Sequence, residues 1–510
     1  MKTAKWRPMI EGLRAARRDT RDVSRLAYAA GGVFALAGML SGCTVGPDYK
    51  APVSDAPPAW KTDSYWKLAQ PSHADEHPDW WAMFDEPDLD TLEQQALDHN
   101  QTLAAALAHY DASRATLANA SAQLVPEVDV GASAARAKTS KNRPLSAYGT
   151  PNYSVTQNDL TVGPQINYDL DLFGRIRRQI EGARASSDQS RDDLANARLV
   201  LTTDLASDYF SLRELDAEID VLNRSVELQQ KALDYVNNQH ELGAVSGLDV
   251  LQQQSQLDAT RVQAQLLLQQ RAQFEHAIAA LAGVAAPQFS IDPKVERTAI
   301  PKIALGVPSD LMQRRPDIAS AERAMAAANA QIGVAKAAFY PSVSLNPAIG
   351  WQSTDFASLF SAPSLMWTIG TMATQVIFDG GRRSANVDFA NDQYRAAEAT
   401  YRQTVLTAFQ QVQDGITGLS VLDGAAAQSH AAVGDAQRLL SLANDRYSGG
   451  LVAYLDVITA QQSLLTSERQ DVQIHGQQLT LSVSLVKALG GGWAVTAPAV
   501  TQPSVASAHD

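Results

Sequence analysis

The residue with the most specific chemistry is Cys43, the only cysteine among 510 residues. It ends the tetrapeptide Leu40-Ser41-Gly42-Cys43, after a basic region and a short apolar run, the order typical of a secretory signal. The tetrapeptide matches a bacterial lipobox, in which the cysteine sulfur receives a diacylglyceryl group and cleavage makes that cysteine the N-terminus. Thr44, in place of aspartate after the cysteine, predicts sorting to the outer membrane. An ordinary signal peptide with a buried cysteine nearby is the alternative.

Histidines supply the other candidate chemistry. The segment "HADEH" places His73 and His77 four residues apart, a spacing that could bind a metal on a helix. Pro71 and Pro78 flank the segment and no further ligand is apparent, so a solvated loop is favoured and no metal is predicted. The sequence contains no phosphate-binding loop, nucleotide fingerprint or nucleophile elbow. We therefore expect neither an enzyme nor a bound cofactor.

Two further motifs have structural explanations. The pair Trp80-Trp81 could form a ligand platform, but packing of the N-terminal segment against the body of the protein is favoured. The motif Arg315-Pro316-Asp317 reads as a helix start, with proline in the first turn and aspartate favourable at the helix dipole.

The charge of the chain excludes some partners. The net charge is −13, and the first 42 residues carry +8 −3 = +5, which leaves −18 for a chain that begins at Cys43. An acidic chain without a basic patch argues against binding to nucleic acid and against adhesion to anionic lipid. No later stretch approaches the eighteen apolar residues of a transmembrane helix.

The chain repeats itself. "ELGAVSGLDVLQQQSQL" at 241–257 aligns with "SGGLVAYLDVITAQQSLL" at 448–465 with an offset of 207, and the same offset places Gly174-Arg175 on Gly381-Arg382. "LVPEVDV" at 124–130 resembles "FYPSVSL" at 339–345, with an offset of 215. One architectural unit is therefore expected twice.

Each repeat predicts a pair of strands and then long helices. Residues 128–134 and 160–170 alternate apolar with polar side chains, and residues 343–351 do so in the second repeat. The strand expected to pair with 343–351, near 365–378, shows this alternation less clearly. The predicted length of about a dozen residues fits a tilted membrane crossing. Heptads of leucine and valine run through 194–236, and neither glycine nor proline interrupts 183–242. Turns at "LGAVSGLD" and "SGGLVAYLD" then send returning helices to about Leu281 and Leu489.

Two membrane hairpins supply four strands per chain, and an open sheet of four strands cannot sit in lipid with unpaired edges. Closure requires several chains, and three would give twelve strands around a channel. The long helices would continue the tube below the membrane.

Seven segments, spread over most of the chain, resemble one family: the TolC-like outer membrane factors of tripartite efflux systems, and among them the NodT-type lipoproteins. The segments are 43–49 with Pro52, "WWAMFDEPDLDTL" (80–92), "YDLDLFGRIRR" (168–178), "RRPDIASAE" (314–322), "FYPSVSL" (339–345), "IFDGGR" (377–382) and "YLDVITAQQSLL" (454–465). The resemblance implies an α+β membrane protein: a homotrimer with a twelve-stranded outer-membrane β-barrel, four strands per chain, continued by a periplasmic α-helical coiled-coil barrel. It also implies docking to a periplasmic adaptor (a membrane fusion protein) and, through it, to an inner-membrane pump of the RND type.

The expected domain organisation follows this plan. It comprises a lipoprotein signal peptide (1–42), an N-terminal anchored extended segment (43–87), a first repeat (88–283, with a helix, a β-hairpin at 125–172 and a helical hairpin at 174–283), an equatorial segment (284–312), a second repeat (313–490, with a helix, a β-hairpin at 341–378 and a helical hairpin at 381–490) and a C-terminal tail (491–510).

The resemblance places a gate and an adaptor-contacting surface at the helical turns. The implied gate residues are Tyr454, Leu455, Asp456, Thr459, Asp249, Arg446 and Tyr447. The implied adaptor-contacting tips are Gly243, Val245, Gly247, Leu248, Gly449, Gly450 and Val452. Several relatives carry a carboxylate where this chain has Thr459, so an acidic ring is in doubt, and Asp249 and Asp456 have the alternative role of helix caps.

The function implied is an outer membrane channel that exports small molecules, such as drugs and toxic compounds, through a trimeric tunnel gated at its periplasmic tip. The alternative is a non-conducting, lipid-anchored coiled-coil scaffold or a periplasmic adaptor. Adaptors typically present one helical hairpin, whereas this chain has two, each preceded by a strand pair.

Overall fold

The computed structural model describes residues 44–52, 57–62, 66, 79–142, 154–303, 305 and 308–491. Cys43, His73 and His77 lie outside these residues, as do the expected signal peptide and nearly all of the expected tail. The chain divides into two compact units, each described by itself: unit 1 holds Met1–Lys50, Ala115–Ala185 and Ala326–Ala396, and unit 2 holds Ala51–Arg114, Ser186–Met325 and Ala397–Asp510.

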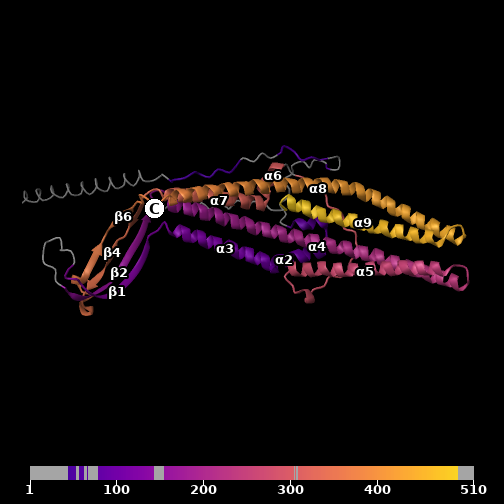
Figure 1. Ribbon diagram of the computed structural model, residues 1–510, viewed down its shortest axis with the longest axis horizontal. Helices are drawn as coiled ribbons and strands as arrows, with labels where there is room; N and C mark the ends of the chain where they lie inside the picture. Colours follow the sequence, from indigo (N-terminus) through magenta and orange to yellow (C-terminus); the bar gives the residue numbers. More distant parts are fainter. Residues whose placement is uncertain are drawn as a thin grey trace, which may run out of the picture. The chain divides into compact units, whose positions relative to one another are not determined.

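The elements follow the repeat predicted from the sequence (Figure 1). The first copy has α2 (Pro87–His99), α3 (Gln101–Ala122), β1 (Glu127–Lys138), β2 (Thr156–Leu170), α4 (Arg175–Glu241) and α5 (Gly247–Leu281). The second has α7 (Pro316–Ala337), β3 (Ser342–Leu345), β4 (Ala348–Ser353), β5 (Leu365–Thr368), β6 (Thr371–Thr374), α8 (Arg382–Ser448) and α9 (Tyr454–Ala488). Short helices η1 (Trp80–Phe84), η2 (Ala286–Gln288), α6 (Pro308–Arg314), η3 (Phe356–Ser358) and η4 (Ala362–Ser364) complete the described chain.

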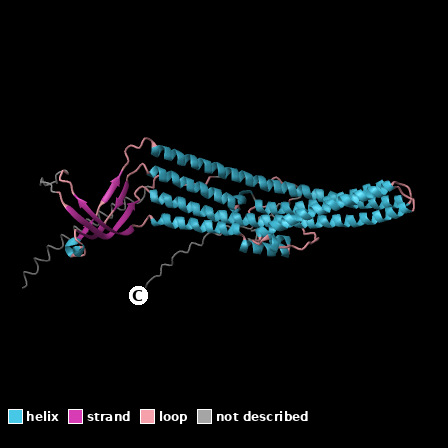
Figure 2. Cartoon of the chain, turned by 60° about the horizontal axis from the view of Figure 1, so that its bottom comes forward, coloured by secondary structure: helices cyan, strands magenta, loops and turns pink. Residues whose placement is uncertain are grey.

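The strands form one antiparallel sheet in unit 1, drawn in magenta in Figure 2. β2 pairs with β1 on one side and with β3 and β4 on the other, and these pair in turn with β6 and β5. The sheet therefore has four strand positions, with β1 at one edge and β5 and β6 at the other, and within the described chain neither edge has a further partner.

The sheet has one apolar face because residues of like character oppose each other across the strands. Ala132 pairs with Val162, Val162 with Trp351, and Trp351 with Leu365, while Ile349 pairs with Trp367. On the other face Ser133 pairs with Thr161, and Thr161 with Gln352. Apolar side chains are left in the open: Trp367 is 71% exposed and Val130 77% exposed.

The strands of the second repeat differ from the expectation, because each is broken in two. Residues 346–347 separate β3 from β4, and residues 369–370 separate β5 from β6. Pro347 has no N–H to donate to the ladder, although its carbonyl still accepts from the Ile166 N–H at 2.9 Å. The last strand also ends at Thr374, four residues before the expected hairpin does.

The helices before the strands are broken at equivalent places in the two repeats: α2 and α3 part at Asn100, and α6 and α7 part at Arg315, 215 residues later. One helix was expected in the first copy, but α2 and α3 are separated at Asn100, which has extended backbone with ψ 123°. Its side-chain oxygen accepts from the Leu103 N–H at 2.9 Å and its amide donates to the Leu281 carbonyl at 2.9 Å. Asn100 thus caps α3 and ties it to the end of α5.

The long helices have matched lengths in the two repeats: α4 and α8 have 67 residues each, and α5 and α9 have 35 each. At 1.5 Å per residue, α4 extends over roughly 100 Å. α4 and α5 form one antiparallel hairpin, and α8 and α9 form another (Figure 1). Among the helices of the described chain, none combines the length and apolar character needed to cross a membrane.

The core of unit 2 gathers around the start of α2 and the middle of α4. Trp81 and Phe84 are 2% exposed and pack with Leu205 and Phe210. The indole N–H of Trp80 donates to the Thr202 hydroxyl at 3.1 Å. The packing role favoured for these tryptophans is therefore observed.

A buried ionic cluster fastens residues 291–298 to the helices of unit 2. The Asp216 carboxylate is 1% exposed and lies 2.6 Å from Arg271 Nε and 3.0 Å from Arg213 Nη1. Both arginines also donate to backbone carbonyls of the segment, Arg271 to Ile291 at 2.6 Å and Arg213 to Asp292 at 2.8 Å. The Lys294 N–H completes the cluster by donating to Asp216. We call Arg213, Asp216, Arg271 and Lys294 the equatorial clamp.

Candidate functional site

The turns between the long helices, where the sequence places a gate, have the same backbone construction. In the first turn the Gly243 N–H donates to the His240 carbonyl and the Ala244 N–H to the Gln239 carbonyl. In the second, the Gly450 N–H donates to Tyr447 and the Leu451 N–H to Arg446. The glycines have φ of +74° and +71°, as a Schellman helix end requires. Both turns are therefore set by backbone conformation.

The two predicted aspartates differ in role. Asp249 accepts from the backbone N–H and the hydroxyl of Ser246, at 3.1 and 3.0 Å, which makes a capping box at the start of α5. Asp456 is in the first turn of α9, whose N-cap residue, Ala453, makes no side-chain capping bond. The capping alternative is therefore correct for Asp249, whereas Asp456 is exposed without a capping partner among the described residues.

Tyr454 is the best-packed of the predicted gate residues. Its side chain is 4% exposed and packs against Val236, Val457 and Tyr447, whose ring centroid lies 5.0 Å away. Burial raises the pKa of both phenols, so both carry their protons at neutral pH. By the offset of 207, Tyr454 corresponds to Gly247 in the first repeat. The ring contact between Tyr447 and Tyr454 therefore occurs on the second hairpin only.

Sequence reasoning missed the partner of this tyrosine. The Tyr454 hydroxyl donates to Gln253 Oε1 at 3.0 Å, and Gln253 Nε2 donates to the Gln229 carbonyl at 2.9 Å. Gln253 is fully buried. The chain of bonds joins α9 to α5 and α5 to α4, so it ties one hairpin to the other near their turns. No local pattern in the sequence marks this bond, because Gln253 and Tyr454 are 201 residues apart.

The remaining predicted residues lie on the surface of the turns. Leu248 and Leu455, which correspond in the repeat, are 63% and 54% exposed. Arg446 and Thr459 are exposed; Arg446 forms no ion pair with any residue that the structure describes, and the Thr459 hydroxyl donates to the Leu455 carbonyl at 2.8 Å. Exposed residues also include Gly243, Gly247, Gly449, Gly450 and Asp456, and half-buried ones Val245, Val452, Asp249 and Tyr447.

A shallow groove of about 500 Å³ runs between α5 and α9 above the turns. Its lining includes Gln256, Thr459, Gln462 and Thr466, and Gln256 Nε2 donates to Gln462 Oε1 at 2.5 Å. No charged side chain lines this groove among the residues that the structure describes.

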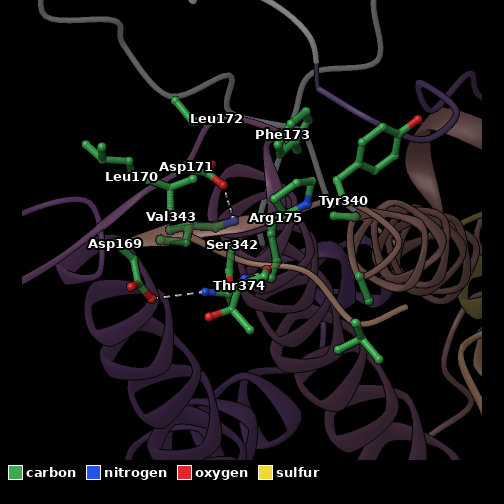
Figure 3. Close-up of a pocket in the computed structure, with 15 residues that line it drawn as sticks. Asp169, Leu170, Asp171, Leu172, Phe173, Arg175, Tyr340, Ser342, Val343 and Thr374 are labelled. Carbon is green, nitrogen blue, oxygen red and sulfur yellow. Dashed lines mark hydrogen bonds and ion pairs between the residues drawn. The ribbon is translucent and has the colours of Figure 1, made fainter. Parts of the chain in front are cut away.

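A second hollow, of about 200 Å³, lies in unit 1 where β2 leads into α4 (Figure 3). Asp171 there accepts from the Ile176 and Arg177 N–H groups at 2.9 Å and so caps α4. Phe173 stacks on Tyr340 with centroids 4.8 Å apart, and Arg175 lies 3.4 Å from Asp169. Its charged groups pair with one another, so the hollow is a structural joint. Within the described chain, no group of three metal-binding side chains occurs.

A family model described as "Outer membrane efflux protein" matches residues 92–284 and 307–491. The chain belongs to the outer membrane efflux protein family. The toluene efflux pump outer membrane protein TtgF of Pseudomonas putida is 31% identical over 466 residues, 90% of this chain and 96% of that protein. The solvent efflux pump outer membrane protein SrpC of Pseudomonas putida is 32% identical over 467 residues, 91% of this chain and 98% of its own length.

Solved structures give the same result for the fold of this efflux protein. The outer-membrane channel OprN matches with a TM-score of 0.82 and 29% identity, covering 88% of this chain and 100% of that one. The Campylobacter jejuni CmeC outer membrane channel matches with a TM-score of 0.79 and 25% identity, covering 88% and 95%. The strand pairs and long helical hairpins are therefore those of an outer membrane efflux channel.

Proposed function

We propose that this efflux protein is the outer membrane exit channel of a tripartite pump, working as a homotrimer. The observation that carries the proposal is the sheet of unit 1, which has an apolar face, a polar face and two edges unpaired within the described chain. In lipid both edges must be paired, and three copies of four strands close a twelve-stranded barrel with its polar faces inward.

The proposed partners are a periplasmic adaptor and an inner-membrane pump of the RND type. Relatives of this chain are named for toluene, solvent, antibiotic and pyoverdine export, so the proposed cargo class is small molecules, and one substrate is not singled out. The adaptor would meet the exposed turns at 243–248 and 449–452. We further propose that the chain has no catalytic activity and needs no cofactor.

The proposed gate lies at the same turns. Tyr454 holds the second hairpin against the first through Gln253, and Tyr447 supports its ring. Arg446, Leu455, Asp456 and Thr459 are exposed in the single chain and would face the neighbouring copies or the narrowed lumen. Opening would follow if the adaptor prefers the arrangement in which the hairpins have separated.

The remaining assignments are proposals of the same kind. Cys43 would be lipidated in the periplasmic leaflet of the outer membrane after removal of residues 1–42. Residues 284–312 would form the equatorial collar, between repeats at 88–283 and 313–490, with 43–87 and 491–510 as the anchored segment and the tail.

The test is electron microscopy and planar-bilayer conductance of the full-length protein purified in detergent from outer membranes. The proposal expects threefold particles with a stain-filled channel and discrete conductance steps. Monomers, or threefold rods without conductance under any applied voltage or with the adaptor present, would instead favour the non-conducting lipid-anchored scaffold.

A further inference from the structure

A short N-terminal segment, residues 44–48, lies against the start of α4 and the C-terminal half of α7 within unit 1. We call these five residues the strap. The Val45 N–H donates to the Phe173 carbonyl at 3.1 Å. At the other end, the Asn329 side chain, itself 5% exposed, donates to the Pro47 carbonyl at 3.0 Å. Both bonds are made with backbone groups of the strap, so they fix its path.

Arg178 is the centre of the contact. Its side chain is 4% exposed, and its guanidinium donates to the Val45 carbonyl at 3.3 Å and to the Gly46 carbonyl at 3.4 Å. It also pairs with Asp48 at 2.7 Å and with Glu181 at 2.7 Å. A buried guanidinium needs its charge compensated and its N–H groups bonded. Without the strap, Arg178 would keep Glu181 alone among the partners that the structure describes.

Three glycines let the backbones approach closely enough for these bonds. A Cβ on Gly333 would lie 2.8 Å from the Arg178 stem, and a Cβ on Gly46 would lie 2.5 Å from the Gly333 Cα. Gly174 has φ +78°, and a Cβ there would lie 2.3 Å from Thr44 Cγ2. Glycine is required wherever backbones meet at such distances. The strap therefore lies in a fitted seat, lined by Gly174, Arg178, Asn329 and Gly333.

We propose that this seat sets where the lipid anchor enters the membrane, with Arg178 as the positioning residue. The proposal rests on the proposed lipidation of Cys43 but not on export. Thr44 follows Cys43 directly, and consecutive Cα atoms are about 3.8 Å apart. Thr44 is held against Gly174, between the end of β2 and the start of α4. The anchor on Cys43 is therefore tethered close to the end of the sheet. This short tether keeps the end of the sheet at a high effective concentration near the bilayer and so favours insertion of the sheet.

The first test asks whether Arg178 holds the strap. Full-length protein in detergent would carry Arg178→Ala or, as a control, Arg184→Ala, which removes an exposed arginine from the same helix. Hydrogen exchange of the peptide that contains Val45 should accelerate at least tenfold in the first variant and remain unchanged in the second. Mass spectrometry of the N-terminal peptide should find the same lipid on Cys43 in both. Unchanged exchange in Arg178→Ala would overturn the assignment of Arg178.

The second test lengthens the tether between Cys43 and the strap and leaves the contacts of the strap with its seat unchanged. Ten Gly/Ser residues, preceded by a threonine to keep the residue after Cys43, would be inserted between Cys43 and Thr44. The control places the same insertion after the strap, between Ala51 and Pro52. The fraction of chain in outer membranes that resists urea extraction should fall at least fivefold for the first insertion and stay at the wild-type level for the second.

Equal insertion by both lengthened chains would overturn the positioning role, because the strap would then only complete the packing of unit 1. An unmodified Cys43 in the wild-type protein would also overturn it. Conductance of the inserted fraction is measured separately, so loss of conductance with the expected response to tether length would count against the exit channel and not against the seat.

Discussion

Glu93 on α2 offers a prediction with a worked magnitude. Its side chain is fully buried, and neither carboxyl oxygen has a hydrogen-bond partner among the described residues. Burial, together with the charge of Asp90, raises the pKa of Glu93 to about 9 from an ordinary 4.5. Glu93 is therefore neutral in the folded protein at pH 7 but ionised in the unfolded chain.

The consequence for stability has a definite sign. Above pH 4.5 the unfolded chain releases a proton that the folded protein keeps, so stability falls as pH rises from 4.5 to about 9. Each pH unit in this window costs about 1.4 kcal/mol, and the total reaches about 3 kcal/mol at pH 7. Glu93→Gln keeps the shape and removes the titration. Its orphan amide adds a cost that is constant with pH, so the slope is the informative quantity.

The assay is thermal unfolding followed by helical circular dichroism in detergent between pH 6 and 8. Over this range the free-energy difference between Glu93→Gln and the wild type should change by about 3 kcal/mol in favour of the variant. For a chain of this size we expect roughly 1–2 °C per kcal/mol, so the midpoints should diverge by about 3–5 °C.

The matched control is Glu322→Gln. Glu93 and Glu322 each lie six residues after the proline that starts their helix, but Glu322 is partly exposed and pairs with Arg323. Its replacement should shift the midpoint by an amount that does not grow between pH 6 and 8. Parallel pH curves for Glu93→Gln and the wild type would refute the reasoning.

Three further predictions concern unit 2. Tyr454→Phe leaves Gln253 Oε1 without its hydroxyl donor, at a cost of about 1–2 kcal/mol. Hydrogen exchange at 449–454 should therefore speed up roughly 5- to 30-fold, and unchanged exchange would show that the Tyr454 hydroxyl does not hold the turn. Asp216→Asn leaves two buried guanidinium groups without full charge compensation and should lower the free energy of unfolding by about 3–5 kcal/mol. Limited proteolysis within 284–303 should then be faster, whereas Asp258→Asn, which removes an exposed ion pair, should leave cleavage unchanged. Burial, reinforced by the charge of Arg297, lowers the pKa of His475 below 6.5. As pH falls below 6.5, the unfolded chain therefore binds a proton that the folded protein does not, and the free energy of unfolding decreases. In His475→Gln the thermal midpoint should depend less on pH between 6.5 and 5, and an equally steep fall in the variant would contradict this.

Periodicity made the elements predictable. The alternation of 160–170 and the heptads of 194–236 depend on residues within one strand or helix, and both appear as β2 and α4. The turns were equally accessible, because glycine at φ near +70° ends a helix for local reasons. The predicted returns at about Leu281 and Leu489 agree with helix ends at Leu281 and Ala488.

What the sequence could not supply are contacts between distant segments. Nothing near Glu93 in the chain marks it as buried, since its burial depends on packing against distant segments, whereas the partner of Glu322 is its neighbour Arg323. The same holds for the bond from Tyr454 to Gln253, which are 201 residues apart. Breaks in the second strand pair had a visible signal in Pro347, but a proline in a strand also fits an unbroken edge, so the pattern alone left the outcome open.

The distribution of tertiary bonds within unit 2 argues for where an opening motion would occur. At the equatorial clamp, Asp216, Arg213 and Arg271 are almost fully buried and fix three backbone groups of residues 291–294, so separating them would uncover charges in a low-dielectric site. Near the turns, the hairpins are joined by two neutral hydrogen bonds, Tyr454 to Gln253 and Gln256 to Gln462, and by a small apolar cluster. One neutral hydrogen bond contributes about 1 kcal/mol, against several for a buried ionic cluster. A partner that favours separated turns therefore needs only a modest difference in affinity to open the tip. Further from the turns, the buried Glu218 carboxylate of α4 pairs with Arg469 of α9 at 2.5 Å, and this ion pair resists the same separation. We expect the hairpins to separate at Tyr454 and to remain joined at Glu218 and Arg469.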